Sequence, residues 1–230
     1  MSVAAARFED TARTARAVFN SEPGRPSGNI VTGRKGGVFM GLEVFGKAAH
    51  SGGNFREGHS AIGELAHKIV ALHAITDVDR GITVNVGLIR GGQSVNTVAP
   101  LAEAEIDLRY VTPDQRDEAM ERIAAIVDTS TVAGTSARLT IKGEFYPLVQ
   151  DEGSKAMFSV YQGAMAAVGA TVEGEFAGGC ADSGFTASVG CPTLCAVGPI
   201  GGKAHSPEEY LEVESLVPRA RGMALAITRL

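Results

Sequence analysis

The segment from Gly37 to Pro147 carries a clear succession of hydrophobic periods. An alternating strand pattern comes first, followed by a helical pattern, two further alternating patterns, a second helical pattern and a last alternating one. The positions that set these periods are Val38, Met40, Leu42 and Val44; Ile62, Leu65, Ala66, Ile69 and Val70; Ile82, Val84, Val86 and Leu88; Ala104, Ile106, Leu108 and Tyr110; Met120, Ile123, Ala124 and Val127; and Leu139 and Ile141. The order strand, helix, strand, strand, helix, strand predicts a ferredoxin-like fold, with one antiparallel sheet and two helices on one face.

The second of these helices has a recognisable start. Thr112-Pro113-Asp114-Gln115 has the form of a capping box, in which a threonine and a glutamine three residues later satisfy each other's backbone N–H groups. Proline is also favoured at the first helical position. We therefore predict that the helix begins directly after Thr112.

The residues on either side of this segment alternate helices and strands. Before it, the pattern predicts a helix at 9–16 and a strand at 17–20. After it, the pattern predicts a helix set by Met157, Val160, Tyr161, Ala164, Met165 and Val168, strands at 171–176 and 193–197, a short helix at 181–189, and a last helix set by Leu216, Ala220, Met223, Ala224 and Ile227. These are too few elements for a doubly wound sheet. We predict an α/β protein in which a ferredoxin-like domain (37–147) is inserted between two pieces of a partial α/β domain (1–36 and 148–230).

Composition and charge exclude several kinds of partner. Of the 230 residues, 44% are hydrophobic, which is enough for a packed core, and the net charge is −5. Nucleic acids and anionic membranes bind to a basic protein face, which an acidic chain is not expected to have. No stretch approaches the roughly 18 apolar residues of a membrane span. Cys180, Cys191 and Cys195 suit a reduced interior. We expect a cytoplasmic protein with no nucleic-acid or membrane partner, whose cysteines act as small buried hydrophobes rather than as a zinc site.

Two residues in the flanking pieces are candidate metal ligands. Glu22 follows a short strand and precedes Pro23, which favours an extended backbone at the glutamate. His205 lies on a glycine-rich loop after the predicted strand 193–197, where an imidazole suits a zinc ligand or a general base. The alternative for each is a solvated turn residue.

Three residues of the ferredoxin-like segment, and one glycine after it, are candidates for the chemistry. His50 follows the first strand, Asn96 lies in a turn between two strands, and Arg109 shares a strand face with acidic residues. Asn96 either caps its turn or contacts a ligand, and Arg109 either forms a cross-strand salt bridge or binds a substrate carboxylate. Gly179 lies in a glycine-rich turn before a short helix, where backbone N–H groups suit an anion; Asp182 next to it is a helix cap in the simpler interpretation.

In chain order, six short motifs resemble those of one family. They are Ser-Glu-Pro (21–23), Gly-Lys-Ala-Ala-His-Ser-Gly (46–52), Ser-Val-Asn-Thr-Val-Ala-Pro (94–100), Asp-Leu-Arg-Tyr (107–110), Gly-Gly-x-x-Asp (178–182) and Ala-His-Ser-Pro-Glu-Glu (204–209). Together they resemble the M20 family of zinc peptidases and amidohydrolases, especially its glutamate carboxypeptidase branch. The resemblance runs from about residue 8 to the C-terminus.

The resemblance implies a fold and a set of roles. Members of the family have an α/β catalytic domain that holds two zinc ions and is interrupted by a ferredoxin-like lid, through which they dimerise. By this likeness, Glu22 is a ligand of one zinc and His205 of the other, and His50 reaches the partner subunit's site to stabilise the oxyanion of the tetrahedral intermediate. The carboxylate or carbonyl end of the substrate would be bound by Asn96, Arg109 and Gly179.

The sequence also departs from the family. The family's His-x-Asp motif, bridging aspartate and Glu-Glu pair, which supply most zinc ligands and the general base, would precede Met1. We therefore expect the N-terminal half of the catalytic domain to be missing and the chain alone to be inactive. In addition, many relatives carry an arginine before the proline at the position of Pro147, where this chain has Glu144 and Tyr146 nearby, so a glutamate-specific pocket is not expected.

Two functional hypotheses follow. The first is zinc-dependent hydrolysis of the amide bond in a small N-acyl or peptidyl amino acid with a free carboxylate, carried out by a homodimer that forms through the lid. The second is a non-catalytic dimerisation or ligand-binding protein derived from such an enzyme. Zinc content and hydrolase activity distinguish the two.

Overall fold

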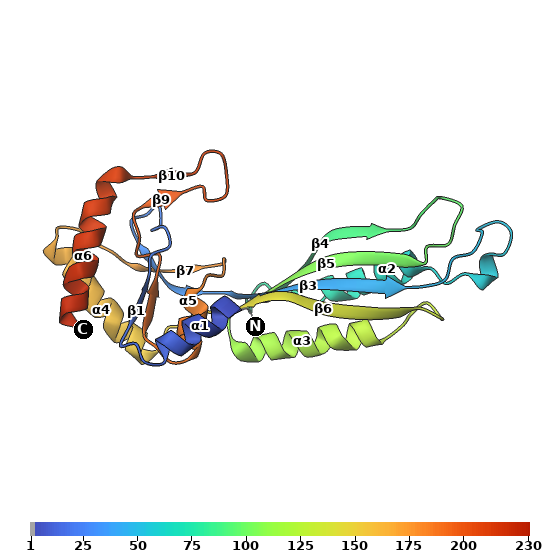
Figure 1. Cartoon of the computed structure of the whole chain (residues 1–230), viewed down its shortest axis with the longest axis horizontal. Helices are drawn as coiled ribbons and strands as arrows, with labels where there is room; N and C mark the ends of the chain where they lie inside the picture. Colours follow the sequence, from blue (N-terminus) through green and yellow to red (C-terminus); the bar gives the residue numbers. More distant parts are fainter. Residues whose placement is uncertain (1–2) are drawn as a thin grey trace. The chain divides into compact units, whose positions relative to one another are not determined.

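The computed structural model describes residues 3–230, which fall into two units. The ferredoxin-like unit comprises Gly37–Glu144, and the α/β unit comprises the residues up to Gly36 together with Phe145–Leu230 (Figure 1). The chain thus leaves the α/β unit, forms the ferredoxin-like unit and returns. The second boundary lies between Glu144 and Phe145, where β6 ends, rather than after Pro147.

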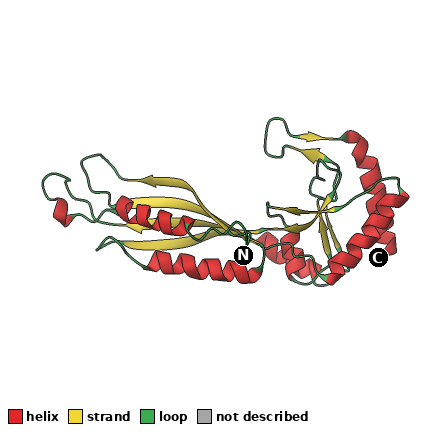
Figure 2. Ribbon diagram, turned by 180° about the vertical axis from the view of Figure 1, so that it is seen from behind, coloured by secondary structure: helices red, strands yellow, loops and turns green. Residues whose placement is uncertain are grey.

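A four-stranded sheet and two helices form the ferredoxin-like unit (Figure 2). Its elements, in chain order, are β3 (Gly36–Phe45), the short 3₁₀ helix η1 (Phe55–Glu57), α2 (Ala61–His73), β4 (Thr83–Gly91), β5 (Leu101–Tyr110), α3 (Pro113–Asp128) and β6 (Ser136–Phe145). The strand order is β4-β5-β3-β6, and β4 pairs antiparallel with β5. The predicted βαββαβ succession and the mixed α/β class are confirmed. The capping box of α3 is also present, with Gln115 N–H donating to Thr112 Oγ1 over 3.4 Å.

One face of this sheet is buried under both helices. Successive strand residues point to opposite faces, so the buried set alternates: Val38, Met40, Leu42 and Val44 of β3, and Ala102, Ala104, Ile106, Leu108 and Tyr110 of β5, which pack against Leu65 and Leu72 of α2 and Ile123 and Val127 of α3. The other face carries ion pairs instead, including Glu43–Arg138 at 2.7 Å. Leu88 was predicted to be buried but is 55% exposed, because a bulge after Val86 shifts the register of β4.

Helix α2 buries only part of the predicted face: Leu65 is in the core and Ile69 packs against it. Ile62, Ala66 and Val70 are exposed, whereas its buried residues are Ala61, Glu64, Leu65, Lys68 and Leu72. The helix therefore has an apolar stripe on its outer surface as well as a buried one. The predicted set combined residues of both stripes, because glutamate and lysine are usually exposed and hydrophobic periodicity therefore does not predict them in a core.

Glu64 and Lys68 are buried as an ion pair of 3.0 Å. Lys68 Nζ also donates to backbone carbonyls at the end of α3 and just beyond it: Ile126 (2.7 Å), Val127 (3.0 Å) and Thr129 (2.7 Å). Glu64 Oε2 accepts from the backbone N–H groups of Thr131 (2.8 Å) and Val132 (2.6 Å). The last carbonyl groups of a helix have no hydrogen-bond partner within the helix. Lys68 donates to these groups of α3, and its positive charge also suits the negative end of the helix dipole.

A second four-stranded sheet organises the α/β unit. Its elements are α1 (Val3–Ala12), β1 (Val18–Asn20), β2 (Ile30–Arg34), α4 (Glu152–Ala167), β7 (Gly174–Ala177), α5 (Ser183–Ser188), β8 (Thr193–Cys195), β9 (Gly201–Gly202), β10 (Tyr210–Leu211), the 3₁₀ helix η2 (Val213–Ser215) and α6 (Leu216–Arg229). The order β1-β8-β2-β7 has parallel outer pairs and an antiparallel bridge between β2 and β8. The sequence missed β2, whose only fully apolar residues are Ile30 and Val31.

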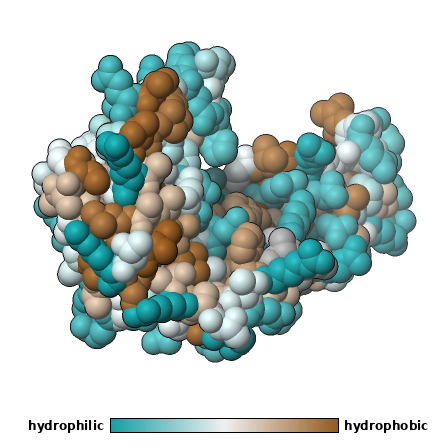
Figure 3. Space-filling model, turned by 60° about the vertical axis from the view of Figure 1, so that its left-hand side comes forward, coloured by the Kyte–Doolittle hydropathy of each residue, from teal (hydrophilic) through white to brown (hydrophobic). Residues whose placement is uncertain are grey.

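Helix α6 packs on α4 through a face that is not its most apolar one. Leu216, Ala220 and Ile227, which were predicted to face the core, are exposed. The buried residues are Arg219, Gly222 and Ala226, and Gly222 is required because a Cβ there would lie 2.0 Å from Met165 Sδ. Hydrophobic side chains consequently remain at the surface of the α/β unit, as Figure 3 shows. None of the helices within residues 3–230 is long and apolar enough to cross a membrane.

Candidate functional site

The loop that carries His50 is closed at its base by the backbone. Lys47 and His59 exchange two hydrogen bonds of 2.9 Å, which leaves residues 48–58 as a loop at the end of β3. Gly46 precedes this closure, and a Cβ there would lie 2.0 Å from the carbonyl oxygen of His59. Glycine is therefore required at this position, where two backbone segments approach closely.

Asn96 lies on a second loop, which pairs with the first. Ser51 N–H donates to Asn96 O over 2.9 Å, and Val98 N–H donates to Ala49 O over 2.9 Å. The Asn96 amide is oriented by Ser94, whose Oγ lies 2.8 Å from Asn96 Oδ1. The structure thus brings His50 and Asn96 together on paired loops at one end of the sheet.

The His50 side chain is exposed and held by the turn that follows it. Its Nδ1 accepts hydrogen bonds of 3.1 Å from the N–H groups of both Gly52 and Gly53. The backbone N–H of His50 donates to Asn54 Oδ1 over 2.9 Å. The ring is therefore oriented even though it faces solvent.

Arg109 lies at the opposite end of the sheet from these loops. The strand β5 runs from Leu101, beside the Asn96 loop, to Arg109, a span of about 27 Å at roughly 3.4 Å per residue. The Arg109 guanidinium pairs with Asp107 on the same strand (2.8 Å) and lies 5.0 Å from the centre of the Phe39 ring. Within one ferredoxin-like unit, a small substrate cannot contact both Asn96 and Arg109.

Glu22 lies in a segment that continues β1 beside the chain that follows β8. Gly198 N–H donates to Glu22 O over 3.0 Å, and Gly24 N–H donates to Pro199 O over 2.8 Å. A Cβ on Gly198 would lie 2.7 Å from the same Glu22 oxygen, so this close pairing needs glycine. The Glu22 side chain is half-buried.

His205 lies exposed in the loop between β9 and β10, a few residues beyond that paired segment. Its backbone is left-handed, with φ 65°, as is that of Lys203 with φ 56°, a conformation that is uncommon for residues other than glycine. Hydrogen bonds from Ser206 Oγ to Lys203 O (2.8 Å) and from His205 N–H to Glu209 Oε2 (3.3 Å) hold the loop. The two predicted metal ligands are thus carried by neighbouring segments, which are joined by a parallel bridge between Gly24 and Ile200.

Gly179 lies in the turn between β7 and α5 and is tied to the sheet by Arg34. The Arg34 guanidinium donates to Gly179 O (3.0 Å) and to Cys195 Sγ (3.2 Å). Cys195 is fully buried at the end of β8, where its sulfur also accepts from Asn20 Nδ2 (3.5 Å). This sulfur therefore accepts polar contacts that the prediction of a plain buried hydrophobe did not include.

Two side chains near the start of α6, which were not among the predicted functional residues, hold both segments that carry the predicted metal ligands. Arg219 is only 4% exposed and donates to Gly28 O (2.5 Å) and to Tyr161 Oη (3.3 Å). Ser215 Oγ accepts from Ile200 N–H over 2.8 Å. Because arginine is almost always exposed, no pattern in the sequence indicated a buried role for Arg219.

Glu22 and His205 are the two residues of this chain that would hold the zinc implied by the resemblance. A carboxylate and an imidazole suit zinc, but a catalytic zinc takes three protein ligands. Among the described residues, no group of three or more His, Cys, Asp or Glu side chains is placed to hold a metal ion. Glu22 and His205 fit zinc by type, but these two ligands do not complete a site.

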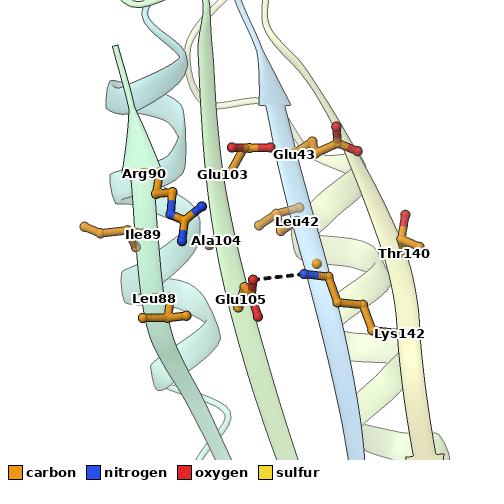
Figure 4. Close-up of a pocket in the computed structure, with 11 residues that line it drawn as sticks. Leu42, Glu43, Leu88, Ile89, Arg90, Glu103, Ala104, Glu105, Thr140 and Lys142 are labelled. Atoms are coloured by element: carbon orange, nitrogen blue, oxygen red, sulfur yellow. Dashed lines mark ion pairs between the residues drawn. The ribbon is translucent and has the colours of Figure 1, made fainter. Parts of the chain in front are cut away.

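An open groove on the exposed face of the ferredoxin-like sheet lies apart from all the candidate residues. It is lined by side chains of all four strands, among them Glu43, Arg90, Glu105 and Lys142 (Figure 4). Lys142 pairs with Glu105 at 3.0 Å and lies across Gly41, where a Cβ would come within 2.8 Å of its Cε. The groove has both charged and apolar lining residues, and none of the predicted site residues lines it.

Comparisons with known proteins show which peptidases the chain is similar to. The family model described as the peptidase dimerisation domain of the M20 family matches residues 32–135. The protein YqjE of Bacillus subtilis is 27% identical over 202 residues, which cover 87% of this chain and 53% of the relative. Carboxypeptidase G2 of Pseudomonas sp. is 24% identical over 223 residues, covering 94% of this chain and 53% of the relative. The crystal structure of a tripeptidase from Staphylococcus aureus superimposes with a TM-score of 0.76 at 22% identity, over 94% of this chain and 57% of that one.

The chain thus contains a segment that matches the dimerisation domain of M20 peptidases, and it is similar in sequence to carboxypeptidase G2 and in fold to a tripeptidase. The matched dimerisation domain covers most of the ferredoxin-like unit, and the structural likeness extends over both units. The chain spans about half the length of the two curated relatives described above.

Proposed function

We propose that this chain forms part of a zinc-dependent enzyme that hydrolyses the amide bond of a small N-acyl or peptidyl amino acid with a free carboxylate. The match to the dimerisation domain of M20 peptidases supports amide hydrolysis, and the name of carboxypeptidase G2 supports a substrate with a terminal carboxylate. Glu22 and His205 are two of the zinc ligands in this proposal. Since they do not complete a site, the roles argued below are those of this chain's own side chains.

The observation that carries the proposal is the pairing of the His50 and Asn96 loops at the end of the sheet opposite Arg109. An exposed, oriented imidazole is suited to donate to a carbonyl oxygen as it becomes an oxyanion, and such donors act most strongly in the transition state. An amide next to it is suited to hold the same substrate. Because Arg109 is about 27 Å away along β5, a substrate held by both Asn96 and Arg109 meets them from two different subunits.

A homodimer is therefore part of the proposed function, and the ferredoxin-like unit offers a surface for it. Strand β4 is at an edge of the sheet, and Leu88 and Ile89 on it are 55% and 64% exposed. The outer stripe of α2, which includes Ile62 and Val70, adds exposed apolar surface. A Cβ on Gly91 of β4 would contact Ile62, so the edge strand and the helix stripe form one continuous surface. An unpaired edge strand beside an apolar stripe suits a second copy of the same unit.

The state of the cysteines supports a reducing compartment, which we infer to be the cytoplasm. Cys191 and Cys195, which are both buried, are free thiols. Burial, with a further contribution from Asp151, raises the pKa of the Cys191 thiol. A buried thiol with a raised pKa is poor in reactive thiolate, which is consistent with a structural role.

The proposal is tested in a chimera that joins this chain to the part of carboxypeptidase G2 outside the matched half. The chimera is incubated with zinc and a panel of N-acyl amino acids and dipeptides, and released amino acid is measured. We expect hydrolysis that is lost in Glu22→Ala and His205→Ala variants. A folded, zinc-loaded, dimeric chimera without hydrolysis would contradict the proposal and favour a non-catalytic dimerisation protein.

A further inference from the structure

The turn that follows His50 contacts one particular nitrogen of its ring. Gly52 N–H and Gly53 N–H both lie 3.1 Å from Nδ1 and donate to it. The turn is held to the same residue by Asn54, whose Oδ1 accepts from His50 N–H (2.9 Å) and whose own N–H donates to His50 O (3.1 Å). Two hydrogen bonds therefore fix the ring to the turn, and two more fix the turn to the backbone of His50.

This arrangement determines where the imidazole proton resides. In a neutral imidazole, one ring nitrogen carries a proton and donates, and the other has a lone pair and accepts. Two N–H groups that converge on Nδ1 are satisfied only if Nδ1 is the acceptor. The proton is then on Nε2, which is the nitrogen on the far side of the ring from the turn.

We propose that the Gly52–Gly53 turn is a tautomer lock, a pair of backbone donors that keeps the proton of His50 on Nε2. Gly52 and Gly53 are positioning residues, because they act on the substrate through the ring. The use of the Nε2–H group, as a donor to the substrate oxyanion, rests on the function proposed above. The lock itself depends only on the geometry of this turn.

The tautomer lock depends on the backbone N–H groups of Gly52 and Gly53 and not on their lack of a side chain. A Cβ on Gly52 would lie 3.6 Å from His50 Cε1, and a Cβ on Gly53 would lie 3.7 Å from Nδ1, which are ordinary van der Waals distances. Neither glycine has a positive φ. Alanine is thus accommodated at both positions and keeps the N–H, whereas proline removes it.

The test is nuclear magnetic resonance of the full chain with ¹⁵N-labelled histidine. The chain has five histidines, and the His50 signals are assigned by their loss in the His50→Gln variant. At a pH where the ring is neutral, we expect Nε2 to be protonated and Nδ1 to show the shift of an unprotonated nitrogen that accepts hydrogen bonds. The Gly52→Ala/Gly53→Ala variant should give the same spectrum. The Gly52→Pro/Gly53→Pro variant should lose the hydrogen-bond shift at Nδ1 and show a mixture of tautomers.

A protonated Nδ1 in the wild-type chain, or a tautomer mixture there, overturns the proposal. A folded double proline variant with the wild-type His50 spectrum overturns it as well. If the proline variant does not fold, the wild-type and alanine spectra still decide. This readout needs no substrate, so it is independent of the activity assay. If the His50 tautomer is fixed but the chimera does not hydrolyse any substrate, only the proposed function is refuted. If the chimera is active but the tautomer is not fixed, only the tautomer lock is refuted.

Discussion

Ser51 and Asn96 are joined by a 2.9 Å hydrogen bond from the backbone N–H of Ser51 to the carbonyl oxygen of Asn96. Each of them belongs to one of the motifs that resemble the M20 family, and the bond joins the loop that carries His50 to the loop that carries Asn96. The two candidate substrate-contacting side chains therefore share one backbone support. A change that opens either loop is expected to displace both.

Gly46→Ala tests that shared support. The added Cβ would lie 2.0 Å from His59 O, so the base of the His50 loop has to open. We expect a loss of stability of about 1–3 kcal/mol, and backbone chemical-shift changes in residues 47–59 that extend to residues 94–98. Gly143→Ala is the control, since its Cβ has no neighbour closer than 3.8 Å. Shift changes confined to the immediate neighbours of Gly46 would contradict the coupling of the two loops.

The buried pair Glu64–Lys68 should make the stability of the ferredoxin-like unit sensitive to acid. Burial raises the pKa of Glu64, but the hydrogen bonds from Val132, Lys68 and Thr131 outweigh it, and the pKa lies below its ordinary value of 4.5. A lowered pKa contributes stability that is fully present above about pH 4.5 and is lost as the pH falls through the lower folded-state pKa. Glu64→Gln should remove this pH dependence.

Glu64→Gln should also reduce the stability at pH 7 by about 3–5 kcal/mol, because it leaves Lys68 as a buried, unpaired cation. Urea denaturation at pH 7 and pH 4 measures both effects. Glu118→Gln, which breaks an exposed ion pair with Arg80, is the control and should cost at most about 1 kcal/mol. If the two variants lose the same free energy of unfolding, burial does not increase the contribution of the Glu64–Lys68 pair to stability.

The sequence predicted the ferredoxin-like fold well because the central strands β3 and β5 alternate regularly between buried and more exposed residues and a capping box marks α3. It failed on the faces of α2 and α6, where charged residues are buried. Lys68 and Arg219 are buried because acceptors from distant segments, mainly backbone carbonyls, receive their hydrogen bonds. Such partners cannot be predicted from local periodicity. The candidate residues were found as motifs, but the separation of Asn96 from Arg109 along β5 was not, because it depends on strand register.

Arg219→Met should destabilise the α/β unit. The variant keeps much of the apolar stem but removes the donors to the part-buried Gly28 O and the buried Tyr161 Oη, so both acceptors lose a partner. We expect a loss of about 2–4 kcal/mol, since unsatisfied buried groups cost about 1–3 kcal/mol each. Arg221→Met, at an exposed position of the same helix, should change the stability by less than about 0.5 kcal/mol. Thermal denaturation of the two variants makes the comparison, and similar melting curves would contradict the role assigned to Arg219.

Ile89→Asp tests the dimer surface on β4. A charge placed on this edge should prevent pairing with a second copy, so the dimer should become a monomer in light scattering at high protein concentration. The control is Ile141→Asp on β6, the other edge of the same sheet, where Ile141 is also exposed. We expect Ile141→Asp to remain dimeric. A monomeric wild-type protein, or dimers that survive Ile89→Asp, would rule out this surface.

The last prediction concerns His50 as a donor across the dimer, in the chimera described above. His50→Ala should lower turnover by about 10²–10³-fold, the usual effect of removing an oxyanion donor. Zinc content and substrate affinity should be nearly unchanged, because the interaction strengthens only in the transition state. A solvated turn histidine would instead give a change of a few-fold at most. Mixing His50→Ala subunits with Glu22→Ala subunits should restore part of the activity, since one site of each mixed dimer then combines an intact Glu22 with an intact His50 from the other subunit. Mixed dimers that form but recover no activity would show that His50 does not act in the partner's site.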